Sequence, residues 1–276
     1  MSAAALSPSQ AAAKVDTPIP LRAHLRHTGA LIRRNLLWIR QDPESMFDAI
    51  LFPVIFTLLF VYVFGGSIGQ SLGGGGQDRY VQYVIPGLLA MMGMNMAQGV
   101  GTGFNQDFNS GVMDRFRSLP IGRGSVLFAK IAVELMRMLF ATVVLLVVAL
   151  LVGYDVHSWG GLLASIGLSA VFGSALMWVF LTLGVVMKSA QSVQAMGFLV
   201  LMPLQFGSSI FAPTATMPGW LQAFTDYNPL SALADTARGL MEGGPVAHPM
   251  WVTLIWSVGL TALMAPVAIH KFRTKS

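Results

Sequence analysis

Six intervals of the chain are long, apolar and nearly free of charge. They lie near residues 47–66, 80–104, 131–152, 159–187, 193–211 and 249–269. A helix needs about 20 mostly apolar residues to cross the hydrocarbon layer of a membrane. The pattern therefore predicts an all-α integral membrane protein with six transmembrane helices. Prolines inside these intervals favour kinks, which neighbouring helices can absorb.

The composition agrees with this pattern. Hydrophobic residues make up 54% of the chain and charged residues only 11%, against about 25% charged in soluble domains. The sequence has no cysteine, which excludes disulfides and thiolate metal sites. Residues 1–20 are rich in Ala, Ser and Pro and lack an unbroken apolar core. We therefore expect a disordered tail at 1–20 and one membrane domain at 21–276.

Lys and Arg gather on one side of the predicted spans. Fourteen of the 17 basic residues lie before the first span, between spans two and three, between spans four and five, or after span six. Basic residues are in excess in cytoplasmic loops, so we expect both termini to be cytoplasmic. Arg79 and Arg238 then fall on the outer side, and Arg137 lies inside the third span.

The stretch "SLGGGGQDR" at residues 71–79 resembles the "LSGGQ" signature that ABC ATPases lay against a nucleotide phosphate. It lies between spans one and two, on the predicted outer side, where no ATP is available. The sequence also has no G-x-x-x-x-G-K-[ST] phosphate loop. We interpret the stretch as a Gly-rich linker and expect the chain not to be an enzyme and to bind no nucleotide or metal itself.

Residues 21–41 predict an amphipathic helix that lies along the cytoplasmic leaflet. Apolar residues recur at helical spacing beside a basic stripe. The arginines that we expect to face anionic headgroups or a partner are Arg26, Arg33, Arg34 and Arg40. Two interpretations stay open here, simple membrane anchoring and contact with a cytosolic partner.

The cytoplasmic loop at residues 105–125 is long for a connection between spans. It mixes charged and apolar residues, and a short helix at 111–118 would end before Leu119–Pro120. Such a helix would present an apolar anchor together with charges, as a docking element does. Its candidate contact residues are Asp114, Arg115, Phe116, Arg117, Leu119 and Pro120. The alternative is a solvated turn that obeys the positive-inside rule.

The segment between spans five and six predicts two short helices that break at Asn228–Pro229. The first carries Trp220 and Phe224 on an aromatic face. The second places Asp235 and Arg238 at i,i+3 spacing, and Arg238 and Glu242 at i,i+4. Each helix is too short to span a membrane. We interpret them as a pair of half-helices that dip into the outer leaflet, with Arg238 held by its acidic neighbours; two amphipathic helices on the membrane surface are the alternative.

Ionisable residues inside the spans are few. Glu134 and Arg137 stand at i,i+3 in the third span, near its cytoplasmic edge, where they can pair or snorkel. A proton relay through them is the alternative. The uncharged middles of the spans disfavour an ion-coupled carrier and suit an apolar or amphipathic cargo. We find no catalytic dyad for a membrane-embedded enzyme.

Gly99 and Gly103 form a G-x-x-x-G motif in the second span. This motif predicts a close helix contact or a dimer seam, although ordinary helix packing explains it equally well.

Three stretches, taken in order, resemble the ABC-2 type permeases, in particular the daunorubicin/doxorubicin resistance permeases of actinobacteria. They are "RRNLLWIRQDPESMFDAILFPVIFTLLFVYVFGG", "GVMDRFRSLPIGRGSVLFAK" and "MPGWLQAFTDYNPLSALADTARGLM". The resemblance covers about residues 25–270 and implies a type V ABC exporter-like fold.

The resemblance also implies partners and cargo. A dimer of six-span permeases in the bacterial inner membrane would associate with two copies of a cytosolic ABC ATPase, which bind ATP and Mg. The N-terminal helix and the 105–125 loop would touch that ATPase, and the region 220–241 would be the re-entrant gate. The cargo would be a hydrophobic drug or, alternatively, a lipid, glycolipid or polysaccharide. Nucleic acid is not an expected partner.

Overall fold

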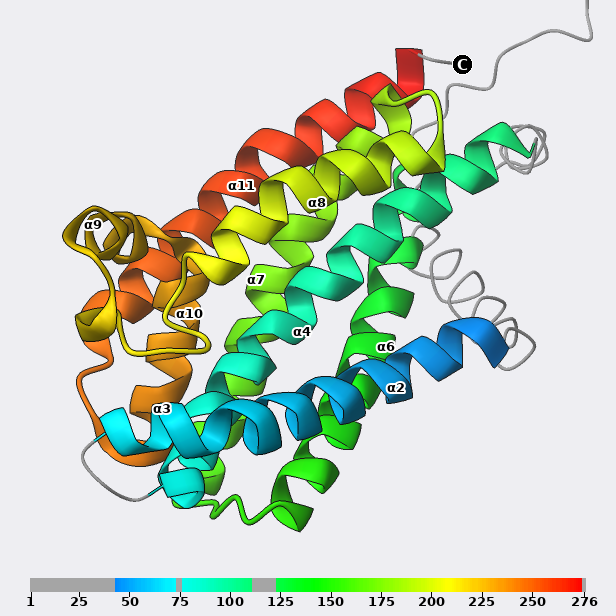
Figure 1. Ribbon diagram of the computed structural model, residues 1–276. Helices are drawn as coiled ribbons and strands as arrows, with labels where there is room; N and C mark the ends of the chain where they lie inside the picture. Colours follow the sequence, from blue (N-terminus) through cyan, green and yellow to red (C-terminus); the bar gives the residue numbers. More distant parts are fainter. Residues whose placement is uncertain (1–42, 73–75, 111–122, 275–276) are drawn as a thin grey trace, which may run out of the picture.

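The computed structural model of the chain describes residues 43–72, 76–110 and 123–274. Every regular element in these ranges is a helix (Figure 1). The expectation of an all-α fold is therefore confirmed for the described part of the chain.

The helices follow one another along the chain and break where the sequence supplies glycine, proline or a capping side chain. In order, they are α2 (Pro43–Leu59), the π-helical turn η2 (Phe60–Phe64), α3 (Gly65–Ser71), α4 (Gly76–Asn109), α6 (Arg123–Leu151), α7 (Trp159–Val186), α8 (Ala190–Phe206), the 3-10 turn η3 (Thr214–Thr216), α9 (Gly219–Tyr227), α10 (Pro229–Arg238), the π-helical turn η4 (Gly239–Gly243) and α11 (Ala247–Thr274).

Four of these helical segments are long and apolar enough to cross a membrane. They are Ala49–Ser71, Leu127–Leu151, Trp159–Val186 and Ala247–Phe272. They coincide with the first, third, fourth and sixth predicted intervals, so the chain is a multi-pass membrane protein. The helices α4 and α8 lie at the second and fifth intervals, and spans at these two places stay a prediction.

Helix α4 forms the centre of the bundle and packs closely on α7. A Cβ atom on Gly93 would lie 3.0 Å from Gly173 Cα, and one on Gly101 would lie 2.6 Å from the carbonyl oxygen of Phe180. Small residues let two membrane helices approach this closely. The G-x-x-x-G motif singled out from the sequence is not at this contact. Within the described residues, no atom comes within 4 Å of a Cβ on Gly99, and Gly103 faces the flexible end of Lys130.

The bundle has two ends of different make-up. One end holds α3, α9 and α10, and the other holds the C-terminal ends of α4 and α11 (Figure 1). We call the first the hairpin end and the second the loop end, because residues 111–122 follow α4 there. At the loop end, Lys130 Nζ of α6 lies 2.7 Å from Asp107 Oδ2 of α4.

Candidate functional site

The hairpin end begins with a sharp break between α9 and α10. Asn228 is the N-cap of α10, and its side-chain oxygen accepts a hydrogen bond from Leu230 N at 2.9 Å. Pro229 occupies the first position of the helix, where its missing N–H costs nothing. This pair explains why the two helices meet at the place that the sequence predicts.

The two helices of the hairpin differ in burial. In α10 most residues are buried against the bundle. In α9, by contrast, Trp220 is 74% exposed and Phe224 42% exposed. The candidate gate residues therefore separate: Asn228 and Pro229 are buried, whereas Trp220 is mostly exposed and the partly exposed Phe224 ring lies against Gly207.

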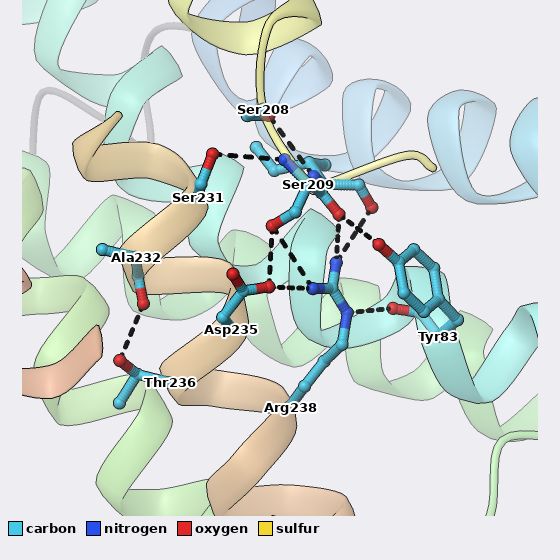
Figure 2. A network of polar contacts seen from close by, with 9 residues as sticks. Tyr83, Ser208, Ser209, Ser231, Ala232, Asp235, Thr236 and Arg238 are labelled. Atoms are coloured by element: carbon cyan, nitrogen blue, oxygen red, sulfur yellow. Dashed lines mark hydrogen bonds and ion pairs between the residues drawn. The ribbon is translucent and has the colours of Figure 1, made fainter. Parts of the chain in front are cut away.

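Arg238 is the hub of a polar network that joins three parts of the chain (Figure 2). Its Nε donates to the carbonyl of Tyr83 on α4 at 3.0 Å. Its Nη1 donates to Asp235 Oδ1, one turn back on α10. Its Nη2 donates to the carbonyls of Ser209 and Ile210, which follow α8. All three guanidinium nitrogens are thus engaged, and three of the four acceptor residues lie outside α10.

Tyr83 and Ser209 complete this network. The Tyr83 hydroxyl donates to the Ser209 carbonyl at 2.7 Å, and the Ser209 hydroxyl donates to Asp235 Oδ1 at 2.7 Å. The guanidinium carbon of Arg238 also lies 3.9 Å from the centre of the Tyr83 ring, a cation–π geometry. The network therefore ties α4, α10 and the connection after α8 into one unit. Sequence reasoning did not find Tyr83 or Ser209, which lie more than a hundred residues apart.

Glu242 does not join Arg238, contrary to the expectation from i,i+4 spacing. The π-helical turn η4 turns its carboxylate toward the connection between α6 and α7 instead. There Tyr154 donates its hydroxyl to Oε1 at 2.7 Å, and His157 Nδ1 lies 3.1 Å from Oε2. Burial and this hydrogen bond to Glu242 raise the pKa of Tyr154 above its usual range. The phenol therefore stays protonated and remains the donor.

A cavity of about 980 Å³ lies beside the Arg238 network. It is bounded by α4, α9, α10, η4 and the start of α11. Its ionisable lining residues are Arg79, Asp226, Asp235, Arg238, Glu242 and His248. At the hairpin end, a backbone that is hydrogen-bonded to Arg238 therefore lies next to a polar cavity. The volume of this cavity suits small-molecule ligands.

The remaining candidate residues fall elsewhere. Glu134 and Arg137 lie together on α6, with Arg137 Nη1 3.3 Å from Glu134 Oε2. The coupling-loop candidates (Asp114, Arg115, Phe116, Arg117, Leu119, Pro120) and the arginines of the interfacial helix (Arg26, Arg33, Arg34, Arg40) lie outside the described residues. Their roles stay predictions from the sequence.

The multi-pass helical bundle defines the class of integral membrane proteins. Residues 26–241 match the ABC-2 type transporter family, and the chain belongs to this family. It is therefore a membrane permease of an ABC transporter.

The chain is similar to several named permeases. The daunorubicin resistance ABC transporter permease protein DrrB1 of Streptomyces coeruleorubidus is 34% identical over 246 residues, which cover 88% of this chain and 84% of the relative. The probable doxorubicin resistance ABC transporter permease protein DrrC of Mycobacterium tuberculosis is 27% identical over 250 residues, which cover 89% and 86%. The inner membrane transport permease YadH of Escherichia coli K12 is 25% identical over 181 residues, which cover 64% and 69%.

Proposed function

We propose that this chain is the transmembrane subunit of an ATP-driven exporter that removes a hydrophobic drug from the cell. The observation that carries the proposal is the similarity to a daunorubicin resistance permease at 34% identity over 88% of this chain. The helices support an apolar or amphipathic cargo, because their middles are almost free of charge.

The proposed architecture has six spans in the bacterial inner membrane and both termini in the cytoplasm. The positive-inside rule supports this orientation, since the loop end carries the basic connections. It places the hairpin end, with Arg238 and its cavity, on the outer side. There α10 and α9 form the re-entrant gate, and α10 supports this role because it is buried within the bundle.

ATP enters the proposed mechanism through another polypeptide. A cytosolic ABC ATPase, present in two copies, binds ATP and Mg and docks on the N-terminal helix and on the predicted coupling loop, whose first residues, 105–109, and last residues, 123–125, belong to α4 and α6 in the structure. Within the loop, Arg115, Phe116 and Arg117 combine charge with an apolar anchor, which supports a docking role. Two permease chains form the dimer through whose seam the cargo moves.

Transport by a reconstituted complex tests the proposed function. The permease and its ATPase are placed together in liposomes, and ATP-dependent movement of doxorubicin is followed by its fluorescence. We expect movement that needs ATP and both subunits. Movement that persists without ATP but collapses with a proton gradient would instead establish an ion-coupled carrier. A complex that ignores doxorubicin but moves a fluorescent lipid would identify a lipid cargo.

The coupling loop has its own test. Replacing Arg115 and Arg117 together by Glu should uncouple ATP turnover from doxorubicin export, because the loop would then repel the acidic partner groups that arginines bind. The permease should still reach the membrane in normal amount. Replacing Lys271 and Arg273, two basic residues at the C-terminal end of α11, by Glu serves as the matched control. Undiminished export by the Arg115/Arg117 variant would remove the loop from the coupling path.

A further inference from the structure

Helix α8 touches the rest of the bundle through one narrow stripe. Its buried residues are Val193, Gly197 and Leu201, at intervals of four, and most of its other side chains are exposed. The helix lies close to its neighbours at Gly197, where a Cβ atom would lie 2.8 Å from Gln98 Nε2 and 2.8 Å from the Phe180 ring. Residues four apart form a single ridge along a helix. Along its length, therefore, α8 is held on only one side.

Asparagine side chains from α4 hold the turn that leads into α8. Asn105 is 1% exposed, and its Nδ2 donates to the carbonyls of Gly184 and Met187, both at 2.9 Å. Asn109 donates to Asn105 Oδ1 at 2.9 Å and to the Lys188 carbonyl at 3.4 Å. The last carbonyls of a helix lack partners within it, and here α4 supplies them. The last turn of α4 is therefore hydrogen-bonded to the α7–α8 turn through these two side chains.

The other end of α8 is held in the same way by the hairpin. Asn228 Nδ2 donates to the carbonyls of Leu204 at 2.7 Å and Gly207 at 2.9 Å. Thr225 of α9 also donates its hydroxyl to the Gly207 carbonyl, at 3.2 Å. Since Asn228 is also the N-cap of α10, one buried side chain joins the end of α8 to the start of α10.

We infer that α8 carries displacement from the loop end of α4 to the α9–α10 hairpin, with Asn105 and Asn228 as the positioning residues at its two ends. This inference rests on the proposed function, in which the ATPase moves the loop that follows α4. The helix has 17 residues and is about 25 Å long at 1.5 Å per residue. Both of its ends are hydrogen-bonded to other elements, so α8 connects the loop end of α4 to the hairpin as one continuous helix.

Helix α4 reaches the hairpin end as well, but it is poorly placed to move alone. Most of its length is buried, and its backbone lies against α7 at Gly93 and Gly101. A shift of α4 relative to α7 would drive these backbones into each other. Interiors packed at this density resist such sliding. The route through α8 starts at the last turn of α4, where Asn105 and Asn109 contact the α7–α8 turn, and does not need the rest of α4 to slide along α7.

Spin labels can measure this motion in the intact complex, because the chain has no cysteine of its own. Cysteines replace Ala223 on α9 and Leu163 on α7, which are both exposed. The distance between the two labels is measured with and without ATP in the permease–ATPase complex in nanodiscs. In the wild-type background we expect ATP to shift this distance.

Asn105→Ala and Asn228→Ala should each abolish the shift and lower doxorubicin export about tenfold, the effect of one lost buried hydrogen-bonding group. ATP turnover should continue, which a merely destabilised permease would not predict. Asn95→Ala is the matched control, since among the described residues the Asn95 side chain donates only to the Met91 carbonyl within its own helix, at 3.1 Å. Its ATP-driven shift should equal that of the wild type. Asparagine variants that keep the full shift would overturn the inference.

A second pair of variants covers the case in which the asparagine variants do not fold. Leu199 and Val200 lie in the middle of α8 and are 69% and 50% exposed. Replacing both by Gly should soften the helix and reduce the shift, whereas replacing both by Ala should not, because Gly is the weaker helix former. A full shift in the Gly variant would overturn the inference. A wild-type complex that exports doxorubicin without a shift would overturn it and leave the proposed function standing; a complex that never exports would overturn both.

Discussion

Arg238 stabilises the hairpin end mainly through backbone carbonyls. Its side chain is 14% exposed, and it binds the main chain of α4 and of the connection after α8 while pairing with Asp235. A guanidinium presents its donors in a planar fork, whereas a lysine ammonium is a single point. The planar arrangement of its donors, and not only its charge, therefore lets Arg238 bind these carbonyls at the same time.

Replacing Arg238 by Lys should lower the stability of the permease by about 2 kcal/mol, because buried carbonyls would lose their donors. The pair with Asp235 can persist in this variant, so loss of charge does not explain the effect. Thermal unfolding in detergent measures the change. Arg79→Lys, at an exposed arginine on α4, is the control and should leave the midpoint unchanged. Equal midpoints for the two variants would contradict this role of Arg238.

Sequence reasoning reached some of these residues and not others. Asn228, Pro229, Asp235 and Arg238 stand close together in the chain, so turn chemistry and helical spacing point to them. Tyr83 and Ser209 are brought to Arg238 only by the packing of three helices. Glu242 misled the spacing argument because η4 is π-helical. A π-helical turn has a different period, which changes the face on which a side chain lies.

At the scale of helices, the contact between α4 and α7 leaves little room for a side chain. A Cβ atom on Gly101 would lie 2.6 Å from the Phe180 carbonyl, whereas one on Gly99, two residues away, meets no described atom within 4 Å. The two glycines are thus on one helix but in opposite surroundings.

Gly101→Ala should destabilise the permease by about 1–3 kcal/mol, because the added methyl group forces the two backbones apart. Gly99→Ala should be neutral or stabilising by up to about 1 kcal/mol, since alanine is the better helix former. Unfolding midpoints of the two variants in the same detergent provide the comparison. If Gly99→Ala proves the more harmful of the two, Gly99 packs against a second chain, as a G-x-x-x-G dimer seam would require.

Helix positions along the chain were predictable because hydropathy is a local property. The observed helices α6, α7 and α11 begin or end close to the predicted intervals. The choice of contact glycines was not predictable, because Gly93, Gly99, Gly101 and Gly103 look alike in a sequence. Which of them faces a neighbour depends on the rotation of α4 about its axis, and that rotation is set by the whole bundle.

For the whole molecule, the hairpin end and the loop end lie at opposite ends of the bundle, so the orientation of the protein in the membrane can be tested. Ser71 ends α3 at the hairpin end and Ser110 follows α4 at the loop end, and both are exposed. The chain has no cysteine, so each serine can be replaced by a single Cys. A membrane-impermeant maleimide should label Cys at 71 in intact cells and Cys at 110 only after permeabilisation. The reverse result would place the hairpin in the cytoplasm and remove it as an outer gate.

A row of carbonyl oxygens holds the end of α8 and the connection after it. Those of Leu204, Gly207, Ser209, Ile210 and Phe211 accept hydrogen bonds from Asn228, Thr225, Tyr83, Arg238 and Tyr80. Every residue type offers the same carbonyl, but an inserted or deleted residue would shift the whole row past its donors. Substitutions in this connection should therefore be tolerated better than insertions or deletions.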